Sequence, residues 1–89
     1  MKTIAITVKG KVQGVWFRHF TKQQAEATGI TGTVRNLENG EVFIIATGEA
    51  YQLQDFIHYC RTGPARAEVT ELVQEELPYQ SFFSFEIIR

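Results

Sequence analysis

Residues 10–18 combine two glycines, a run of main-chain N–H groups and an arginine in an order that could bind a phosphate group. The segment reads Gly-Lys-Val-Gln-Gly-Val-Trp-Phe-Arg and leads into residues that tolerate a helix. Unpaired N–H groups and the positive end of the dipole make a helix start an anion site. Gly14 lets successive N–H groups turn inwards, and the Arg18 guanidinium can grip two phosphate oxygens. The pattern is neither a Walker loop nor a dinucleotide-binding fingerprint, and a plain glycine turn beside a solvated arginine explains it equally well.

Apolar alternation and turn signals predict five strands, at residues 3–9, 30–36, 41–47, 67–75 and 82–88. The first has the pattern of a half-buried antiparallel strand, with Ile4, Ile6 and Val8 on its apolar face. The second and third are joined by residues 37–40, which contain the Asn-Gly hairpin signal. The aromatic cluster of the last strand is predicted to be core; its members are Phe82, Phe83 and Phe85.

Two helices are predicted, at residues 17–28 before Gly29 and at residues 50–61 before Gly63-Pro64. The first is only weakly amphipathic, and its expected inward positions are Phe20, Ala25 and Ala27. The second has a clear apolar stripe, formed by Leu53, Phe56, Ile57 and Cys60.

The order βαββαβ, with room for a short extra strand near the C-terminus, predicts one domain over residues 1–89. The fold class is α+β, a ferredoxin-like sandwich of an antiparallel sheet with two helices packed on one face. A right-handed crossover through the first helix returns the chain to the other end of the sheet before the second strand begins. Residues 10–18, Asn36, the 37–40 hairpin and the Gly63-Pro64 turn should therefore lie at one end of the sheet.

The net charge of −1 and the pI near 6.1 argue against a general nucleic-acid binder, which would carry a basic excess. The single cysteine, Cys60, excludes an intrachain disulfide and a cysteine-rich zinc site. The N-terminus lacks the pattern of a signal peptide, and no apolar run approaches the length of a membrane span. We expect a monomer in the reducing cytoplasm, without nucleic-acid or membrane partners.

Two stretches of the chain carry a family resemblance. Residues 10–18 match Gly-x-Val-Gln-Gly-Val-x-Phe-Arg, and residues 32–42 match Gly-Thr-Val-Arg-Asn-x-x-Asn-Gly-x-Val. Together they resemble the two signatures of the acylphosphatases, and the resemblance covers essentially the whole chain. It implies an enzyme that hydrolyses the carboxyl–phosphate bond of a small-molecule acyl phosphate to a carboxylate and inorganic phosphate. The scheme needs no cofactor and no metal.

The resemblance also implies which residues act. The phosphate-binding loop of the family falls on Gln13, Gly14, Val15, Trp16, Phe17 and Arg18. Arg18 is then the phosphate-binding arginine, and Asn36 is the asparagine that orients the attacking water. An amide cannot take a proton from that water, so the phosphate itself is expected to accept it. Two departures are visible: Thr33 stands where an aromatic residue is common, and Asn39 where an aspartate is common.

Several other features have ordinary structural interpretations. His19, beside Arg18, is interpreted as a surface residue, while Trp16 either lines the pocket or covers the core. His58 and Cys60 are too few for a metal site, and Cys60 lies on the buried stripe.

Two non-catalytic alternatives use the same fold. An RNA-recognition module would need stacking aromatics on the central strands, where the third strand offers only Phe43. A phosphate- or anion-binding module without turnover is disfavoured because Arg18 and Asn36 are both present.

Overall fold

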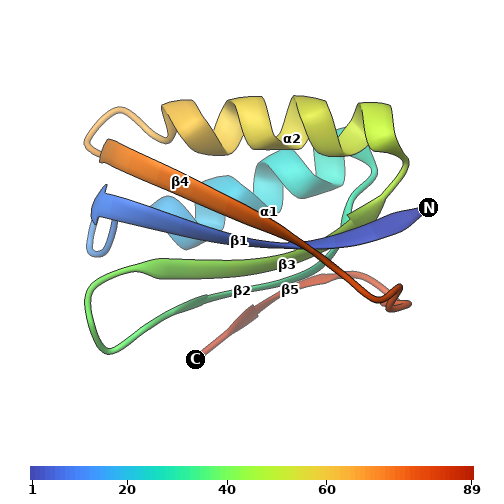
Figure 1. The fold of residues 1–89 in the computed structure, drawn as a ribbon. Coiled ribbons are helices and arrows are strands. Elements are labelled where there is room, and N and C mark those ends of the chain that lie inside the picture. The colour runs from blue at the N-terminus through green and yellow to red at the C-terminus, as the bar shows by residue number, and fades with distance from the viewer.

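The computed structural model describes residues 1–89 as five strands and two helices (Figure 1). The elements are β1 (Lys2–Lys11), α1 (Phe17–Thr28), β2 (Thr31–Asn36), β3 (Val42–Gly48), α2 (Ala50–Thr62), β4 (Glu68–Leu77) and β5 (Phe85–Ile88). All seven elements were expected, and most boundaries differ by one or two residues. The last strand is the exception, because it begins at Phe85 instead of residue 82.

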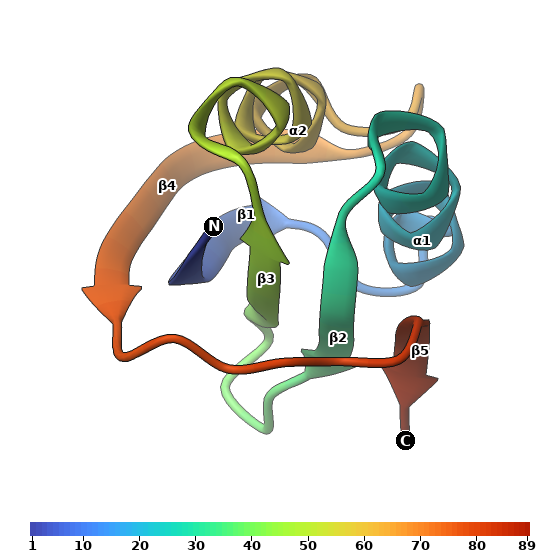
Figure 2. The ribbon, with the colours of Figure 1, turned by 90° about the vertical axis from the view of Figure 1, so that its right-hand side faces the viewer.

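The strands form one sheet in the order β4-β1-β3-β2-β5. Both helices cover the same face of it, as Figures 1 and 2 show. The ferredoxin-like α+β class is confirmed, but the sheet is not wholly antiparallel. β5 pairs with β2 in parallel, because the chain crosses under the sheet after β4 and enters the far edge in the same direction as β2.

The main core lies between the helices and the sheet. As predicted, Ile4, Ile6 and Val8 point into it from β1. The apolar stripe of α2 is also confirmed, with Leu53, Phe56 and Cys60 buried and Ile57 partly buried against them. Full burial of each large side chain stabilises the fold by about 1.5–3 kcal/mol.

The buried face of α1 matches the prediction only in part. Ala25 is buried as predicted, together with Phe17 and Thr21, whereas Phe20 is half-buried and Ala27 is exposed. The face is set by the loop before the helix, which directs Phe17 into the core. Thr21 follows one turn later, and its hydroxyl donates a 2.8 Å hydrogen bond to the Phe17 carbonyl. A polar residue is therefore tolerated at a buried position that apolar periodicity could not identify.

The second face of the sheet is partly covered by the segment 78–84, which crosses beneath it from β4 to β5 (Figure 2). Thr3 is fully buried on this face, and Thr47 is 3% exposed. Their hydroxyls lie 2.7 Å apart. The Gln80 N–H donates to Thr3 Oγ1 at 2.8 Å, and Thr47 Oγ1 donates to the Gln80 carbonyl at 2.8 Å. These bonds close a ring that fixes the crossing segment, so β1 is not simply half-buried as predicted.

The same crossing corrects the predicted aromatic cluster. Phe85 is buried in the core, Phe82 is half-buried and Phe83 is fully exposed. Only Phe85 lies on the strand, because the preceding residues form the irregular crossing segment. Sequence alternation cannot show where such a segment becomes a strand.

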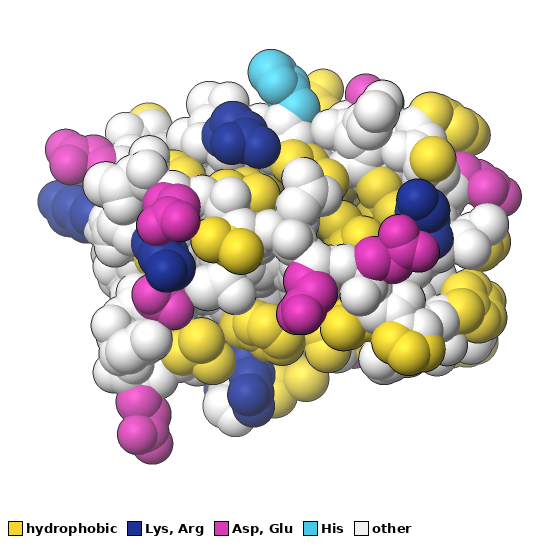
Figure 3. Space-filling model, in the orientation of Figure 1, with side chains coloured by type: hydrophobic (Ala, Val, Ile, Leu, Met, Phe, Trp, Pro, Cys, Tyr) yellow, Lys and Arg dark blue, Asp and Glu magenta, His cyan; other side chains and the backbone are white.

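The two edge strands are β4 and β5. β4 carries exposed glutamates at positions 68, 71, 75 and 76, and its pairing with β1 has a bulge at Lys9/Gly10. Edge charges and bulges discourage pairing with another chain. Figure 3 shows acidic and basic side chains interspersed on the face that bears α2 and β4. Neither helix is long and apolar enough to cross a bilayer.

Candidate functional site

Three connections meet at one end of the sheet, on the left in Figure 1, as the topology predicts. Gln13, between β1 and α1, donates from Nε2 to the carbonyls of Leu37 and Glu41, at 2.8 and 2.9 Å. These bonds fasten the loop to the β2–β3 hairpin. The turn after α2 packs closely as well, because a Cβ atom at Gly63 would lie 3.0 Å from the Phe17 ring. The loop is thus held from both sides.

The backbone of this loop has an alternating conformation. Gly14 and Trp16 have φ of 72° and 71°, while φ of Val15 between them is negative. Where the sign of φ alternates in this way, consecutive N–H groups can turn towards one point and form a concave anion-binding nest. Trp16 is the one non-glycine residue with positive φ, a conformation that costs about 1–3 kcal/mol.

The start of α1 has no internal partner for its N–H groups. No side chain caps it, and its first turn carries no acidic residue. None of the loop, turn and cap hydrogen bonds is donated by an N–H of residues 12–19. By contrast, α2 begins with a complete capping box between Glu49 and Gln52. The helix dipole and free N–H groups of α1 therefore favour an anion.

A hollow of about 270 Å³ lies against this helix start. It is lined by Val12, Gly14, Trp16, Phe17, Arg18, His19 and Asn36. The two residues expected to act, Arg18 and Asn36, thus meet in one place although they belong to different elements. Arg18 is half-buried and takes part in no ion pair, so its guanidinium is free to meet an anion.

Asn36 ends β2, and its side-chain Oδ1 is buried without any hydrogen-bond partner in the protein. A buried acceptor left in this state costs about 1–3 kcal/mol. Asn36 also lines the hollow, so its side-chain amide has hydrogen-bonding capacity at the site that no protein group uses.

Three other residues of the predicted phosphate-binding loop do not offer their side chains to an anion. Val15 and Phe17 are buried in the core, so only their main chain is available to a ligand. Both Nε2 hydrogens of Gln13 are donated to carbonyls of the β2–β3 hairpin, and this residue does not line the hollow. Gln13 therefore positions the loop and offers only its main chain to an anion.

Sequence reasoning missed one feature of the site. The rings of Trp16 and His19 stack, with centroids 4.1 Å apart and an interplanar angle of 18°. Both residues are exposed, as expected for His19, and both line the hollow, so Trp16 does not cover the core. The two residues are three positions apart, a spacing that brings side chains together on a helix, and this spacing could have indicated the contact from the sequence.

The departures from the family pattern leave the site intact. Asn39 Oδ1 accepts a 3.1 Å hydrogen bond from the Glu41 N–H, so this asparagine makes the turn as expected. Thr33 is half-buried and does not line the hollow.

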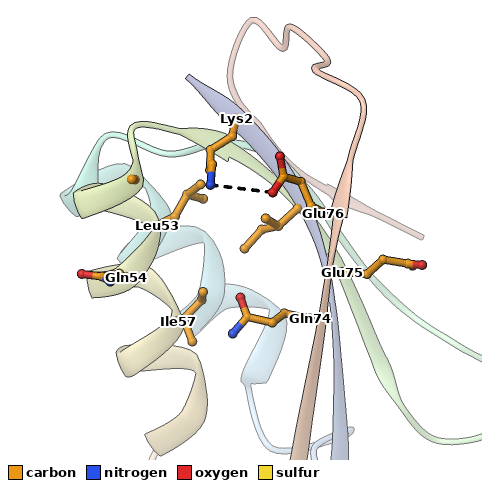
Figure 4. A pocket seen from close by; sticks show the side chains of 9 residues that line it. Lys2, Leu53, Gln54, Ile57, Gln74, Glu75 and Glu76 are labelled. Atoms are coloured by element: carbon orange, nitrogen blue, oxygen red, sulfur yellow. Dashed lines mark ion pairs between the residues drawn. The ribbon is translucent and has the colours of Figure 1, made fainter.

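A second hollow lies at the opposite end of the sheet, between α2 and β4 (Figure 4). Its floor is apolar, formed by Ile4, Leu53 and Ile57. It does not suit phosphate, because the Lys2 ammonium is already paired with Glu76 at 3.7 Å. The first hollow is better suited to an anion.

The remaining candidates have no role at the site. Burial raises the pKa of the Cys60 thiol to about 12, which makes it a packing residue and not a nucleophile. His58 is exposed on α2. No three His, Cys, Asp or Glu side chains gather in one place.

Comparison with known proteins gives a consistent result. The family model described as Acylphosphatase matches residues 4–87. An acylphosphatase of Marinobacter nauticus is 47% identical over 79 residues, which are 89% of this chain and 86% of the relative. The crystal structure of acylphosphatase from Bacillus subtilis has a TM-score of 0.97 at 32% identity and covers 100% of both chains. An acylphosphatase structure from Coxiella burnetii has a TM-score of 0.94 at 34% identity, covering 98% of this chain and 92% of that one.

Proposed function

Because the chain belongs to the acylphosphatase family, it is an enzyme that hydrolyses acyl phosphates, and we propose that Arg18 and Asn36 perform the reaction without a metal ion. The observation that carries this proposal is that Arg18 and Asn36, from different elements, line one hollow, and that no protein group bonds to Asn36 Oδ1. Membership of the family favours an enzyme over both non-catalytic alternatives.

In the binding step, the phosphate group enters the nest at the start of α1. The N–H groups of residues 14–18 and the helix dipole meet its oxygens, and the Arg18 guanidinium forms two parallel hydrogen bonds with them. Arg18 is not neutralised by a carboxylate, so its full charge acts on the substrate. The same donors stabilise the charge that spreads over the equatorial oxygens in the transition state.

In the hydrolytic step, Asn36 Oδ1 accepts a hydrogen bond from the attacking water. This orients a lone pair of the water oxygen towards phosphorus. A bond forms between that oxygen and phosphorus while the bond from phosphorus to the acyl oxygen breaks, and the carboxylate leaves with the electron pair. The amide cannot take the proton, so it passes to a phosphate oxygen. Since a carboxylate is a good leaving group, positioning and charge stabilisation suffice.

Hydrolysis of benzoyl phosphate, followed by loss of ultraviolet absorbance in EDTA, tests this assignment. Turnover should survive chelation. Arg18→Ala should lose about 100- to 1,000-fold in kcat, as when a preorganised oxyanion donor is removed. Arg61→Ala, which removes an exposed arginine of α2 outside the hollow, is the matched control and should retain activity.

The role of Asn36 has its own test. Asn36→Ala should lose about 100-fold or more in kcat and still bind inorganic phosphate, because water positioning and anion binding are separate tasks. Asn39→Ala is the control, since Asn39 shapes the neighbouring turn only. Failure of folded wild-type protein to turn over would leave a phosphate-binding module. Turnover that requires a divalent metal would refute the metal-free scheme.

We also propose that the enzyme acts as a monomer in the cytoplasm, on a free small molecule and without nucleic acid. The balanced charge and the acidic edge strand β4 support this. Light scattering at assay concentration tests the oligomeric state. Unchanged activity in the presence of RNA tests the expectation that nucleic acid takes no part.

A further inference from the structure

The Trp16–His19 stack has no structural task that explains it. The Trp16 side chain is 65% exposed, so it contributes little to the core. Its backbone is in the left-handed region, with φ of 71°, which glycine would adopt without strain. A strained residue that presents a large flat ring to solvent at the rim of a catalytic hollow indicates a binding role.

The pair also separates two hollows. Beside the phosphate site lies a third hollow of about 460 Å³, between α1 and the edge strand β5. Trp16 and His19 are the residues that line both. The charges that line this third hollow balance, because Lys22 and Arg89 are matched in number by Glu26 and Glu86. Lys22 and Glu86 form an ion pair at 4.0 Å.

The reaction geometry decides which part of the substrate meets this pair. In an in-line displacement, the leaving acyl oxygen lies opposite the attacking water. The water is assigned to Asn36 and the phosphate to Arg18 and the loop main chain. Among the residues that line the hollow, Trp16 and His19 are the exposed side chains without a task. The acyl group therefore points away from Asn36 and towards the aromatic pair.

On the basis of the proposed function, we propose that the Trp16–His19 pair is the acyl-group subsite and selects flat, uncharged acyl groups. A planar group gains dispersion and stacking energy on the indole face. The balanced charges of the adjoining hollow offer no net attraction to a second anionic group. Trp16 and His19 are thus specificity-determining residues, and the hollow between α1 and β5 accommodates the far end of a longer acyl group.

The test compares kcat/KM for benzoyl phosphate with kcat/KM for acetyl phosphate. Trp16→Gly removes the ring and retains a residue that adopts positive φ without strain. We expect the benzoyl-to-acetyl ratio to fall by about 2- to 12-fold, the range for loss of an aromatic stacking contact. The loss should lie in KM more than in kcat, because stacking acts equally in the ground and transition states. Trp16→Phe, which keeps a flat ring, should largely restore the ratio.

An altered ratio distinguishes this role from general damage to the loop, which would lower both activities equally. An unchanged ratio in Trp16→Gly, with acetyl phosphate still hydrolysed, would overturn the subsite and leave the proposed function standing. Failure of the wild-type protein to hydrolyse either substrate would overturn both. A clear preference for 4-carboxybenzoyl phosphate over benzoyl phosphate would overturn the assignment to uncharged groups.

A second readout needs no variant. Trp16 is the single tryptophan of the chain, so fluorescence that is excited at 295 nm or above comes from this ring alone. Benzoylphosphonate, which resists hydrolysis, should change the emission more strongly than acetylphosphonate or inorganic phosphate at equal saturation. Equal responses to all three would refute contact between the acyl group and the ring.

Discussion

The hydrogen-bonded ring of Thr3, Thr47 and Gln80 should make a measurable contribution to stability that is independent of catalysis. Thr3→Val keeps the side-chain shape and removes only the hydroxyl. In the folded protein this hydroxyl is fully buried, accepts from the Gln80 N–H at 2.8 Å and lies 2.7 Å from Thr47 Oγ1. Two polar groups lose a partner, at a net cost of about 1 kcal/mol for each hydrogen bond.

We therefore expect Thr3→Val to lower the free energy of unfolding by about 2 kcal/mol, or Tm by about 8–16 °C for a domain of this size. Thr7→Val is the matched control, because Thr7 is half-buried on the same face of β1 and its hydroxyl makes no hydrogen bond within the protein. Its stability should change by less than about 0.5 kcal/mol.

Urea denaturation followed by circular dichroism measures both variants and the Thr3→Val/Thr47→Val pair. The double variant should lose less free energy of unfolding than the two single variants lose together, since neither threonine hydroxyl is then left without the other. Benzoyl phosphate turnover should be unchanged, because the ring lies at the end of the sheet opposite the hollow. Equal free energies of unfolding for Thr3→Val and Thr7→Val would refute the stabilising role of the ring. So would a double variant whose loss equals the sum of the two single losses.

Three further predictions concern the site and the core. Asn36→Ala should change the free energy of unfolding by less than about 0.5 kcal/mol while it lowers kcat, because no protein group bonds to Oδ1 and would lose its partner; thermal melts beside the assay measure this, and a large loss of stability would contradict it. Gln13→Ala should lower kcat and weaken phosphate binding together, because two hydrogen bonds that hold the loop on the hairpin are lost; unchanged kinetics would refute that role. Burial raises the pKa of Cys60 from 9.0 to about 12, so between these values the unfolded thiol loses its proton first, and stability should fall as pH rises. In Cys60→Val the free energy of unfolding, measured by urea titration at each pH, should fall less over this range. The same dependence on pH in both proteins would contradict the burial effect.

The site collects several arrangements that are unfavourable on their own. A tryptophan has positive φ, a helix starts without a cap and a buried amide oxygen lacks a partner, all around one hollow. Each costs on the order of 0.5–3 kcal/mol. At the other end of the sheet, α2 has a complete capping box, and the Met1 amino group pairs with Glu49 at 3.2 Å. A phosphate with its attacking water would satisfy the free N–H groups and the amide oxygen.

Much of the fold could be predicted from the chain because its signals are local. Alternating apolar residues, the Asn-Gly turn and Gly29 act over a few residues, and the right-handed crossover places the loop, Asn36 and the hairpin at one end. The loop and its arginine were recognisable for the same reason. What local patterns could not indicate was the buried face of α1, since Phe17 is directed inwards by the loop before it.

The amino-acid sequence by itself determined the order of the elements, the end of the sheet at which the 10–18 loop and Asn36 lie, and the reaction class, because these depend on short-range patterns and matched signatures. Only the tertiary structure decided that β5 pairs in parallel with β2, that Thr3 is buried beneath the crossing segment and that Trp16 stacks on His19 at the rim of the hollow. These features depend on contacts between side chains and backbone whose relative positions are set by packing. A one-dimensional pattern does not contain those positions until the chain has folded.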